Sequence, residues 1–253
     1  MFLASFLALG ILGRDIRLEP AQLAFCIMAA LVTQATWIHR LGLAKVGLAS
    51  ALITSLGLGL LVRADNLWVH PLLATLAISS KFLLRIDGRH LFNPANLGAV
   101  LAATVLPGAW VAGGQWGQDW LIALWFVLLG CWVSLRSGRL DGGLMFLACW
   151  VSLLVTRAWW FGYEPAVVAH QLGNGALLLF AFFMITDPMT SPTRTTTRAA
   201  HAAAVAILAF TWQYGLHRPN GLLIALFALA PMVVLLERAW PGAVWRWPGK
   251  IPR

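Results

Sequence analysis

The sequence predicts an all-α integral membrane protein with about ten transmembrane helices. Of its 253 residues, 60% are hydrophobic and only 11% are charged, whereas roughly a quarter of the residues of a soluble domain carry charge. The chain also contains 14 Trp residues, and Trp concentrates at membrane interfaces. A chain with so few charged residues has a mostly apolar surface, which lipid solvates and water does not. In lipid a helix is favoured because it satisfies its own backbone hydrogen bonds.

The apolar runs between short polar segments give the predicted helices in chain order. They cover residues 1–13, 20–38, 46–62, 66–84, 94–112, 118–135, 142–161, 168–186, 199–216 and 219–237. A helix needs about 20 residues to cross the hydrocarbon core, so several runs are short. The first is the weakest, and nine helices are the alternative. No polar insertion separates the runs, so residues 1–253 are predicted to form a single polytopic membrane domain.

The Lys and Arg residues alternate in number from loop to loop, which predicts the orientation. Cytoplasmic loops carry an excess of these residues. Thirteen of the 18 follow even-numbered helices: Arg40, Lys45, Lys81, Arg85, Arg89, Arg136, Arg139, Arg194, Arg198, Arg238, Arg246, Lys250 and Arg253. The other five follow odd-numbered helices: Arg14, Arg17, Arg63, Arg157 and Arg218. The alternation places both termini in the cytoplasm and supports ten helices.

The net charge of +9 does not indicate a nucleic-acid-binding protein. The basic residues stand singly between apolar runs and form no basic helix face. Membrane lipid is therefore the predicted partner, and no nucleic acid is expected. The three Cys residues stand alone inside apolar runs, so no metal site is predicted.

Two polar segments interrupt the apolar pattern in a similar way. Asn93 precedes Pro94 at the start of the fifth run, and Asp187 precedes Pro188 at the end of the eighth. The residue before Pro avoids helical geometry, and Pro has no N–H. Broken helices are therefore predicted at Asn93-Pro94 and Asp187-Pro188, and paired breaks are typical of inverted repeats with a central ligand site. Ordinary helix caps at the membrane interface are the alternative.

The polar residues of these segments form the candidate site, where they could bind a flavin or an ion. They are Asn93, Asn96, Thr186, Asp187, Thr190 and Ser191. Asp187 is the acidic residue closest to membrane depth, which makes it the candidate for ion or proton handling. Arg89 lies in a basic cluster before the first segment and is a candidate partner for a ligand phosphate. A loop that follows the positive-inside rule explains the same cluster.

Both segments resemble motifs of one family. Residues 92–98, FNPANLG, are similar to the FNPAxxG element of the RnfD/NqrB family, membrane proteins of the Rnf electron-transport complex and of the Na⁺-translocating NADH:quinone oxidoreductase. Residues 183–191, FMITDPMTS, are similar to that family's TDPVT element. Shorter similarities at residues 49–58, 173–176 and 218–221 support the resemblance, which extends over residues 46–240.

The resemblance implies a bacterial inner-membrane protein of two inverted halves that moves electrons, in some complexes coupled to ion translocation. It also implies other redox membrane subunits or a flavoprotein as partners, and an electron-relay role without substrate chemistry of its own. Family members usually carry FMN covalently on a Thr in the loop after the fifth helix. That loop here, residues 107–118, contains no Thr. A short form that lacks the covalent site is therefore expected.

Thr193 stands six residues after Asp187, the spacing of the attachment motif, but the charge alternation places it on the cytoplasmic side. A non-covalent flavin, FMN or riboflavin, is the expected cofactor, since Trp, Asn and Thr can supply apolar walls and hydrogen bonds. Haem is the alternative carrier, but His70, His170 and His201 do not pair at helical spacing.

Two other functions stay open. An inverted-repeat bundle with broken helices is also a scaffold for a channel or transporter of small solutes or ions. An anchoring protein without a site of its own is the third interpretation. An electron-transport protein should purify with a chromophore, whereas a channel should not.

Overall fold

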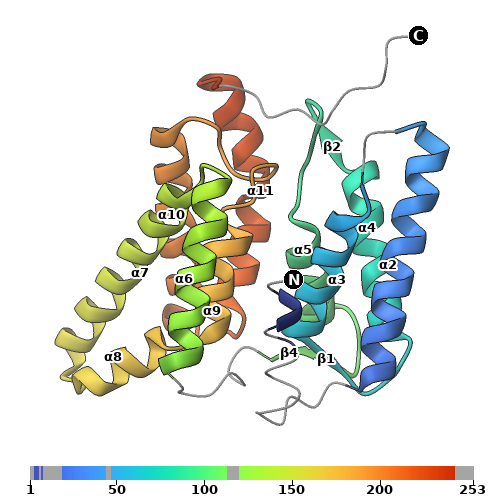
Figure 1. The fold of residues 1–253 in the computed structure, drawn as a ribbon. Coiled ribbons are helices and arrows are strands. Elements are labelled where there is room, and N and C mark those ends of the chain that lie inside the picture. The colour runs from blue at the N-terminus through green and yellow to red at the C-terminus, as the bar shows by residue number, and fades with distance from the viewer. Residues whose placement is uncertain (1–2, 6, 8–18, 44–46, 113–119, 243–253) are drawn as a thin grey trace. The chain divides into compact units, whose positions relative to one another are not determined.

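The computed structural model describes residues 3–5, 7, 19–43, 47–112 and 120–242 of the chain. These residues form two compact units, unit 1 within Met1–Ala112 and unit 2 within Gly113–Val244 (Figure 1). Both units are mainly helical, as predicted. Most of the first apolar run and half of the loop that would carry a covalent flavin lie outside the described residues.

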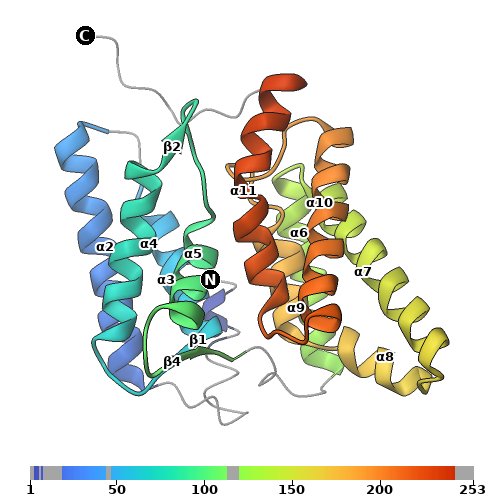
Figure 2. The same cartoon turned by 180° about the vertical axis from the view of Figure 1, so that it is seen from behind.

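Unit 1 combines helices with two short antiparallel ribbons. Its helices are α2 (Pro20–Leu41), α3 (Ala49–Leu61), α4 (Val69–Leu83) and α5 (Pro94–Thr104). Its strands are β1 (Val62–Ala64), which pairs with β4 (Ala109–Val111), and β2 (Arg85–Ile86), which pairs with β3 (Arg89–His90). Figure 2 shows α2 and α4 side by side, and α2 also packs against α3.

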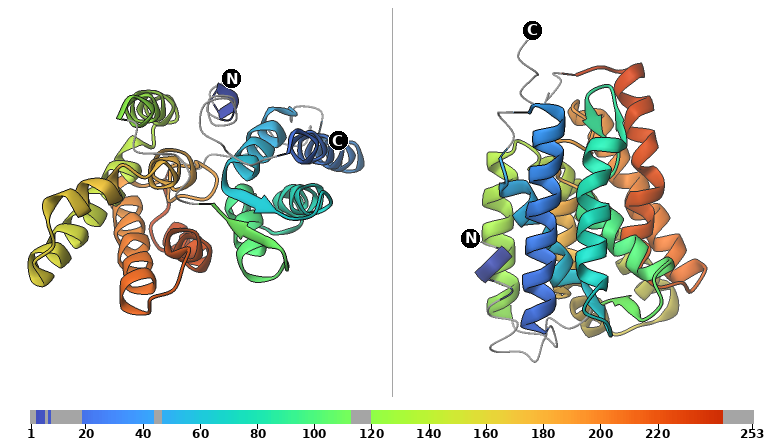
Figure 3. Two further views of the ribbon diagram at one scale, coloured as in Figure 1. Left: turned by 90° about the horizontal axis from the view of Figure 1, so that it is seen from below. Right: turned by 90° about the vertical axis from the view of Figure 1, so that its right-hand side faces the viewer.

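Unit 2 is a helical bundle. Its helices are α6 (Trp120–Arg136), α7 (Leu140–Phe161), α8 (Pro165–Leu172), α9 (Gly175–Leu179), α10 (Thr195–Phe210) and α11 (Gly221–Ala239). The π-helical turns η1 (Phe180–Met184) and η2 (Thr211–Gly215) continue α9 and α10. The left view of Figure 3 shows this bundle end-on, with α9 packed beside α6. The apolar side chains of α9 and η1 supply much of the core, with Phe180 and Phe182 almost fully buried.

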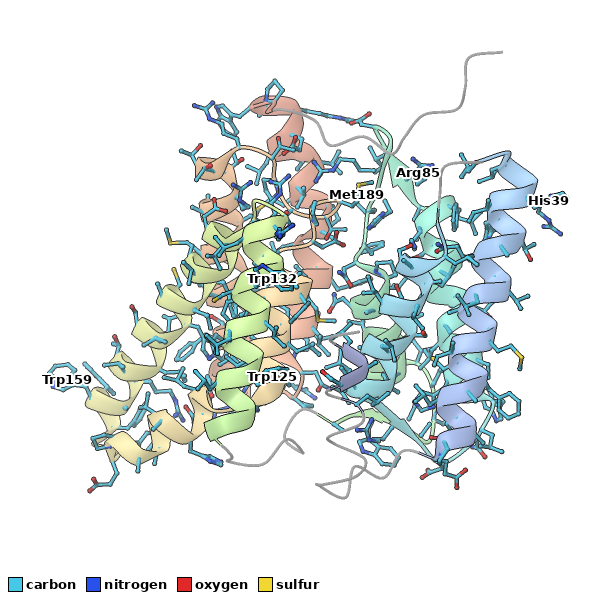
Figure 4. All side chains as sticks on the ribbon, in the orientation of Figure 1. His39, Arg85, Trp125, Trp132, Trp159 and Met189 are labelled. Atoms are coloured by element: carbon cyan, nitrogen blue, oxygen red, sulfur yellow. The ribbon has the colours of Figure 1, made fainter. Side chains whose placement is uncertain are left out.

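The outer surfaces of the helices carry large apolar side chains. Trp159 is 78% exposed and Trp160 is 74% exposed at the end of α7. Figure 4 shows Trp159 pointing away from its helix, and Trp125 and Trp132 along α6. Surfaces of this kind need lipid or a partner to cover them, and exposed Trp is typical of the membrane interface.

Three helices, α2, α7 and α11, are long and apolar enough to cross a membrane, and there are four such spans if the bent pair of α8 with α9–η1 is counted as one. The chain is therefore a multi-pass membrane protein. The finer count of ten spans stays a prediction. The helices α3 and α5 have 13 and 11 residues, fewer than the roughly 20 that a straight span needs.

Neither Pro motif interrupts a helix, which corrects the two predicted breaks. Asn93 is the N-cap of α5, and Pro94 occupies the first helical turn. Asp187 and Pro188 lie in the loop between η1 and α10. Pro94 fits the first turn of α5, where its missing N–H costs nothing, and Pro188 lies in a loop outside any helix. A polar residue before Pro therefore indicates a helix terminus in this chain and not a break within a helix.

A bend of 52° separates α8 from α9 at a position that the Pro signals do not mark. The α8 helix ends at Leu172, and α9 restarts after Asn174, whose side chain accepts a hydrogen bond from the Ala176 amide at 2.8 Å. This cap replaces the hydrogen bonds that a continuous helix would make. The segment 165–184 is thus a broken helix made by Gly and Asn.

Candidate functional site

The first candidate segment lies in unit 1, at the start of α5. The Asn93 Oδ1 atom accepts a hydrogen bond from the Asn96 amide at 3.1 Å, so Asn93 has a capping role. Asn96 is 1% exposed and lies inside the first turn. Gly98 follows on α5, where a Cβ would meet the Leu58 side chain of α3 at 2.6 Å. The FNPAN motif therefore starts a short helix that packs closely on α3.

Replacing Asn93 with Ala is expected to lower the free energy of unfolding by about 1 kcal/mol, because α5 loses its cap. Thermal unfolding of both proteins in one detergent measures the loss. Asn66→Ala is the control, since Asn66 is exposed and its side chain makes no hydrogen bond to a described residue. Equal stability of the two variants would contradict the capping role.

Arg89 and His90 are buried, 8% and 6% exposed, in the strand that leads to the first segment. The turn before them has positive φ angles at Asp87 and Gly88, the geometry that suits a two-residue hairpin. Burial shows that Arg89 is not a freely solvated loop residue.

A buried polar cluster joins α2, α3 and α4, and sequence reasoning missed it. The Lys81 ammonium donates to Gln34 Oε1 and to Ser50 Oγ, both at 2.8 Å. Gln34 is fully buried, and Lys81 is 3% exposed. In the sequence, Lys81 looked like a loop residue and Gln34 like a single polar residue in an apolar run. An ionisable group inside a membrane bundle is a candidate for function.

The second candidate segment lies in unit 2 and forms a closed turn. The Asp187 Oδ1 atom accepts a hydrogen bond from the Met189 amide at 3.0 Å. The backbone carbonyl of Asp187 accepts hydrogen bonds from the Ser191 amide at 3.0 Å and from the Ser191 hydroxyl at 2.8 Å. Asp187 and Ser191 therefore organise the loop from within. Thr190, between them, is 6% exposed, and its hydroxyl makes no hydrogen bond to a described residue.

The π-helical turn η1 positions the start of this loop. The Thr186 hydroxyl donates to the Phe182 carbonyl at 2.6 Å, and the Ser134 hydroxyl of α6 donates to the same oxygen at 2.9 Å. Ser134 is fully buried. Single π-helical turns are rare in proteins, and those that occur are often found at functional sites. Two hydroxyl groups thus hold the altered backbone just before Asp187.

Two buried arginines hold the far end of the loop. Arg139 Nη1 donates to the Pro192 carbonyl at 2.7 Å, and Arg198 Nη1 donates to the carbonyls of Pro192 and Thr193 at 2.9 and 3.0 Å. Arg198 also forms an ion pair with Asp141 at 2.6 Å. The charge pattern had assigned both arginines to loops, with no signal for burial.

The remaining sequence candidates are Thr193 and the three histidines His70, His170 and His201. The Thr193 hydroxyl donates to Glu237 Oε2 at 2.8 Å. His70 belongs to unit 1 and His201 to unit 2, and both are buried, whereas His170 is exposed on α8. Among the described residues, no three His, Cys, Asp or Glu side chains gather as a metal site would require.

The sequence of unit 2 matches a known family over almost its whole length. The model of the NQR2, RnfD, RnfE family matches residues 114–241, half of the chain. The chain belongs to this family. Members of the NQR2, RnfD, RnfE family are membrane subunits for electron transport and ion translocation. The matched region includes the loop around Asp187, whereas residues 92–98 lie outside it. A comparison with curated proteins gives no match.

Proposed function

We propose that this NQR2, RnfD, RnfE family member is an electron-transport protein of the RnfD/NqrB type. It is a short form without the covalent-FMN loop, and it holds a flavin non-covalently or positions redox partners. The family match over residues 114–241 carries the proposal. In this proposal ten helices form two inverted halves in the bacterial inner membrane, and both termini are cytoplasmic. Its partners are redox membrane subunits or a flavoprotein.

The loop after η1 offers a flavin one hydroxyl that is not already used. Asp187 and Ser191 hydrogen-bond within the loop, and Thr186 donates to Phe182. The Thr190 hydroxyl makes no hydrogen bond to a described residue, and Thr190 is 6% exposed, so this hydroxyl can pair with a ligand. A flavin carbonyl or ring nitrogen would satisfy it, and the buried Met189 beside it adds an apolar contact. Asp187 is the proposed residue for ion handling.

The visible absorption spectrum of the detergent-purified protein tests the proposal. A flavin spectrum is expected, and acid precipitation should release the flavin into the supernatant. Thr190→Val should lower the bound flavin about fivefold, the effect of one lost hydrogen bond. Thr36→Val is the matched control, because that hydroxyl is exposed and bonds only the Val32 carbonyl.

Two results would change the proposal. A colourless protein after gentle purification would remove the main support for electron transfer through this protein. Flavin that stays with the acid pellet would mean covalent attachment, with Thr193 as the first residue to test.

The broken helix at residues 165–184 favours a channel or transporter as the second candidate. Its two halves are bent by 52°, and bent half-helices line substrate paths in many transporters. If the purified protein is colourless and vesicles containing it take up a solute or an ion, the channel or transporter function is favoured over electron transport.

A further inference from the structure

Arg63 is a buried cation in β1, directly after α3, and it is 3% exposed. Its Nη1 atom donates to the carbonyls of Gly59 and Val62 at 2.8 and 2.7 Å. Gly59 belongs to the last turn of α3, where carbonyls lack helical partners. Arg63 therefore caps this helix with one of its three nitrogens.

The other edge of the Arg63 guanidinium makes no hydrogen bond to a described residue. Its Nε atom is buried without a partner. The Nε and terminal N–H groups on that side form the fork with which Arg binds a carboxylate or phosphate through two parallel hydrogen bonds. The cap thus leaves the anion-binding edge of Arg63 unused.

No described Asp or Glu forms an ion pair with Arg63. Asp65 is two residues away but exposed. Burial lowers the pKa of Arg63 to about 10, so the guanidinium is still charged at neutral pH. A buried charge without a counter-charge is costly, and a bound anion would remove that cost.

His70 at the start of α4 approaches the same place. It is fully buried, and its Nε2 atom lies 3.3 Å from the Val62 carbonyl oxygen that also accepts from Arg63. Because a carbonyl only accepts, Nε2 carries the proton. The Nδ1 atom is buried without a partner. Arg63 and His70 therefore meet at one oxygen, and each keeps one buried nitrogen unused.

We propose that Arg63 and His70 bind a phosphate ester beside the β1–β4 ribbon of unit 1. The free fork of Arg63 binds two phosphate oxygens, beside the unpaired Nδ1 atom of His70, whose Nε2–H points to the Val62 carbonyl. A phosphate is favoured because β1 lies in the connection between α3 and α4, and helix connections of membrane proteins lie at headgroup depth. The ester belongs to a lipid headgroup or to a flavin nucleotide, and only the flavin source depends on the proposed function.

The flavin source is tested by titrating the flavin-free protein with FMN and with riboflavin, which lacks the phosphate, and following flavin fluorescence. If the site takes a flavin nucleotide, the wild-type protein prefers FMN by about tenfold or more, the value of a charge-assisted hydrogen-bond pair. Arg63→Gln abolishes the preference without weakening riboflavin. Arg218→Gln, an exposed arginine from another loop, keeps it.

The lipid source is tested on the same variants by native mass spectrometry after reconstitution with phosphatidylglycerol. If the site takes a lipid headgroup, wild-type protein and Arg218→Gln retain a bound phosphatidylglycerol, and Arg63→Gln loses it about tenfold more readily. This result can be obtained with a colourless protein. It therefore separates failure of the phosphate site from failure of the proposed electron-transport function.

The proposal is overturned if Arg63→Gln matches Arg218→Gln in both experiments while its elution and unfolding temperature equal those of the wild type. If Arg63→Gln does not fold, Arg63→Lys replaces it, since Lys keeps the charge and loses the fork. Arg63→Lys should lose about tenfold in phosphate-ester binding. If folded Arg63→Lys binds both FMN and phosphatidylglycerol as tightly as the wild-type protein does, the proposal is also overturned.

Discussion

Replacing Arg198 with Ala is expected to lower the free energy of unfolding by about 3 kcal/mol, because it removes the buried cation of an ion pair and two charge-assisted hydrogen bonds to loop carbonyls. Arg198 is 5% exposed, and its partner Asp141 is 39% exposed at the side chain. The Pro192 and Thr193 carbonyls lose the same donor. Thermal or denaturant unfolding in one detergent measures the change.

Arg136→Ala is the matched control for Arg198→Ala. Arg136 is exposed, and among the described residues its guanidinium interacts with the Trp132 ring, 5.4 Å from the ring centroid, so its loss should cost about 0.5 kcal/mol or less. A second readout is the flavin content, which should fall in the Arg198 variant because the loop around Asp187 loses an anchor. Equal stability of the two variants would show that Arg198 does not hold this loop.

Replacing Gly143 with Ala should destabilise unit 2 by about 2–3 kcal/mol, since a methyl group does not fit between α7 and η1. A Cβ atom at Gly143 would overlap the Ala181 carbonyl oxygen and lie 3.2 Å from the Thr186 side chain. The carbonyl belongs to the backbone of the π-helical turn, which cannot rotate away as a long side chain does. The unfolding temperature in detergent measures this cost.

Gly47→Ala controls for the loss of glycine itself. Nothing lies within 4 Å of the Cβ position at Gly47, and its φ is not in the left-handed region, so the change should be neutral or slightly stabilising. If Gly143→Ala is as stable as Gly47→Ala, α7 and η1 are not in close contact. The flavin content of a folded Gly143 variant then shows whether the π turn matters for binding.

The helix positions could largely be predicted from the sequence. The apolar run 142–161 became α7 (Leu140–Phe161), and the run 219–237 became α11 (Gly221–Ala239). Length and apolar composition are local properties, so one stretch of chain contains the information. The alternative interpretation of Asn93 as a helix cap was also local, and the structure shows that cap.

The bend at Asn174 and the π turns could not be predicted in the same way. A single Gly-Asn pair is common in loops and has no unique geometry. The π turn at Phe180–Met184 depends on hydroxyl groups that bond the Phe182 carbonyl, and one of them, Ser134, comes from another helix. The residues next to Phe182 in the sequence give no indication that the Ser134 hydroxyl bonds its carbonyl, because Ser134 lies 48 residues away in the chain.

The sequence by itself determined a multi-pass helical membrane protein, its family motifs and the residues that begin its helices, because apolar length and caps act within one segment. Only the tertiary structure decided which polar groups meet. Lys81 reaches Gln34 across 47 residues, and Arg198 reaches Asp141 across 57. Burial of a charge depends on its partners in space, so the arginines and lysine that composition assigned to loops became buried anchors only when the helices packed.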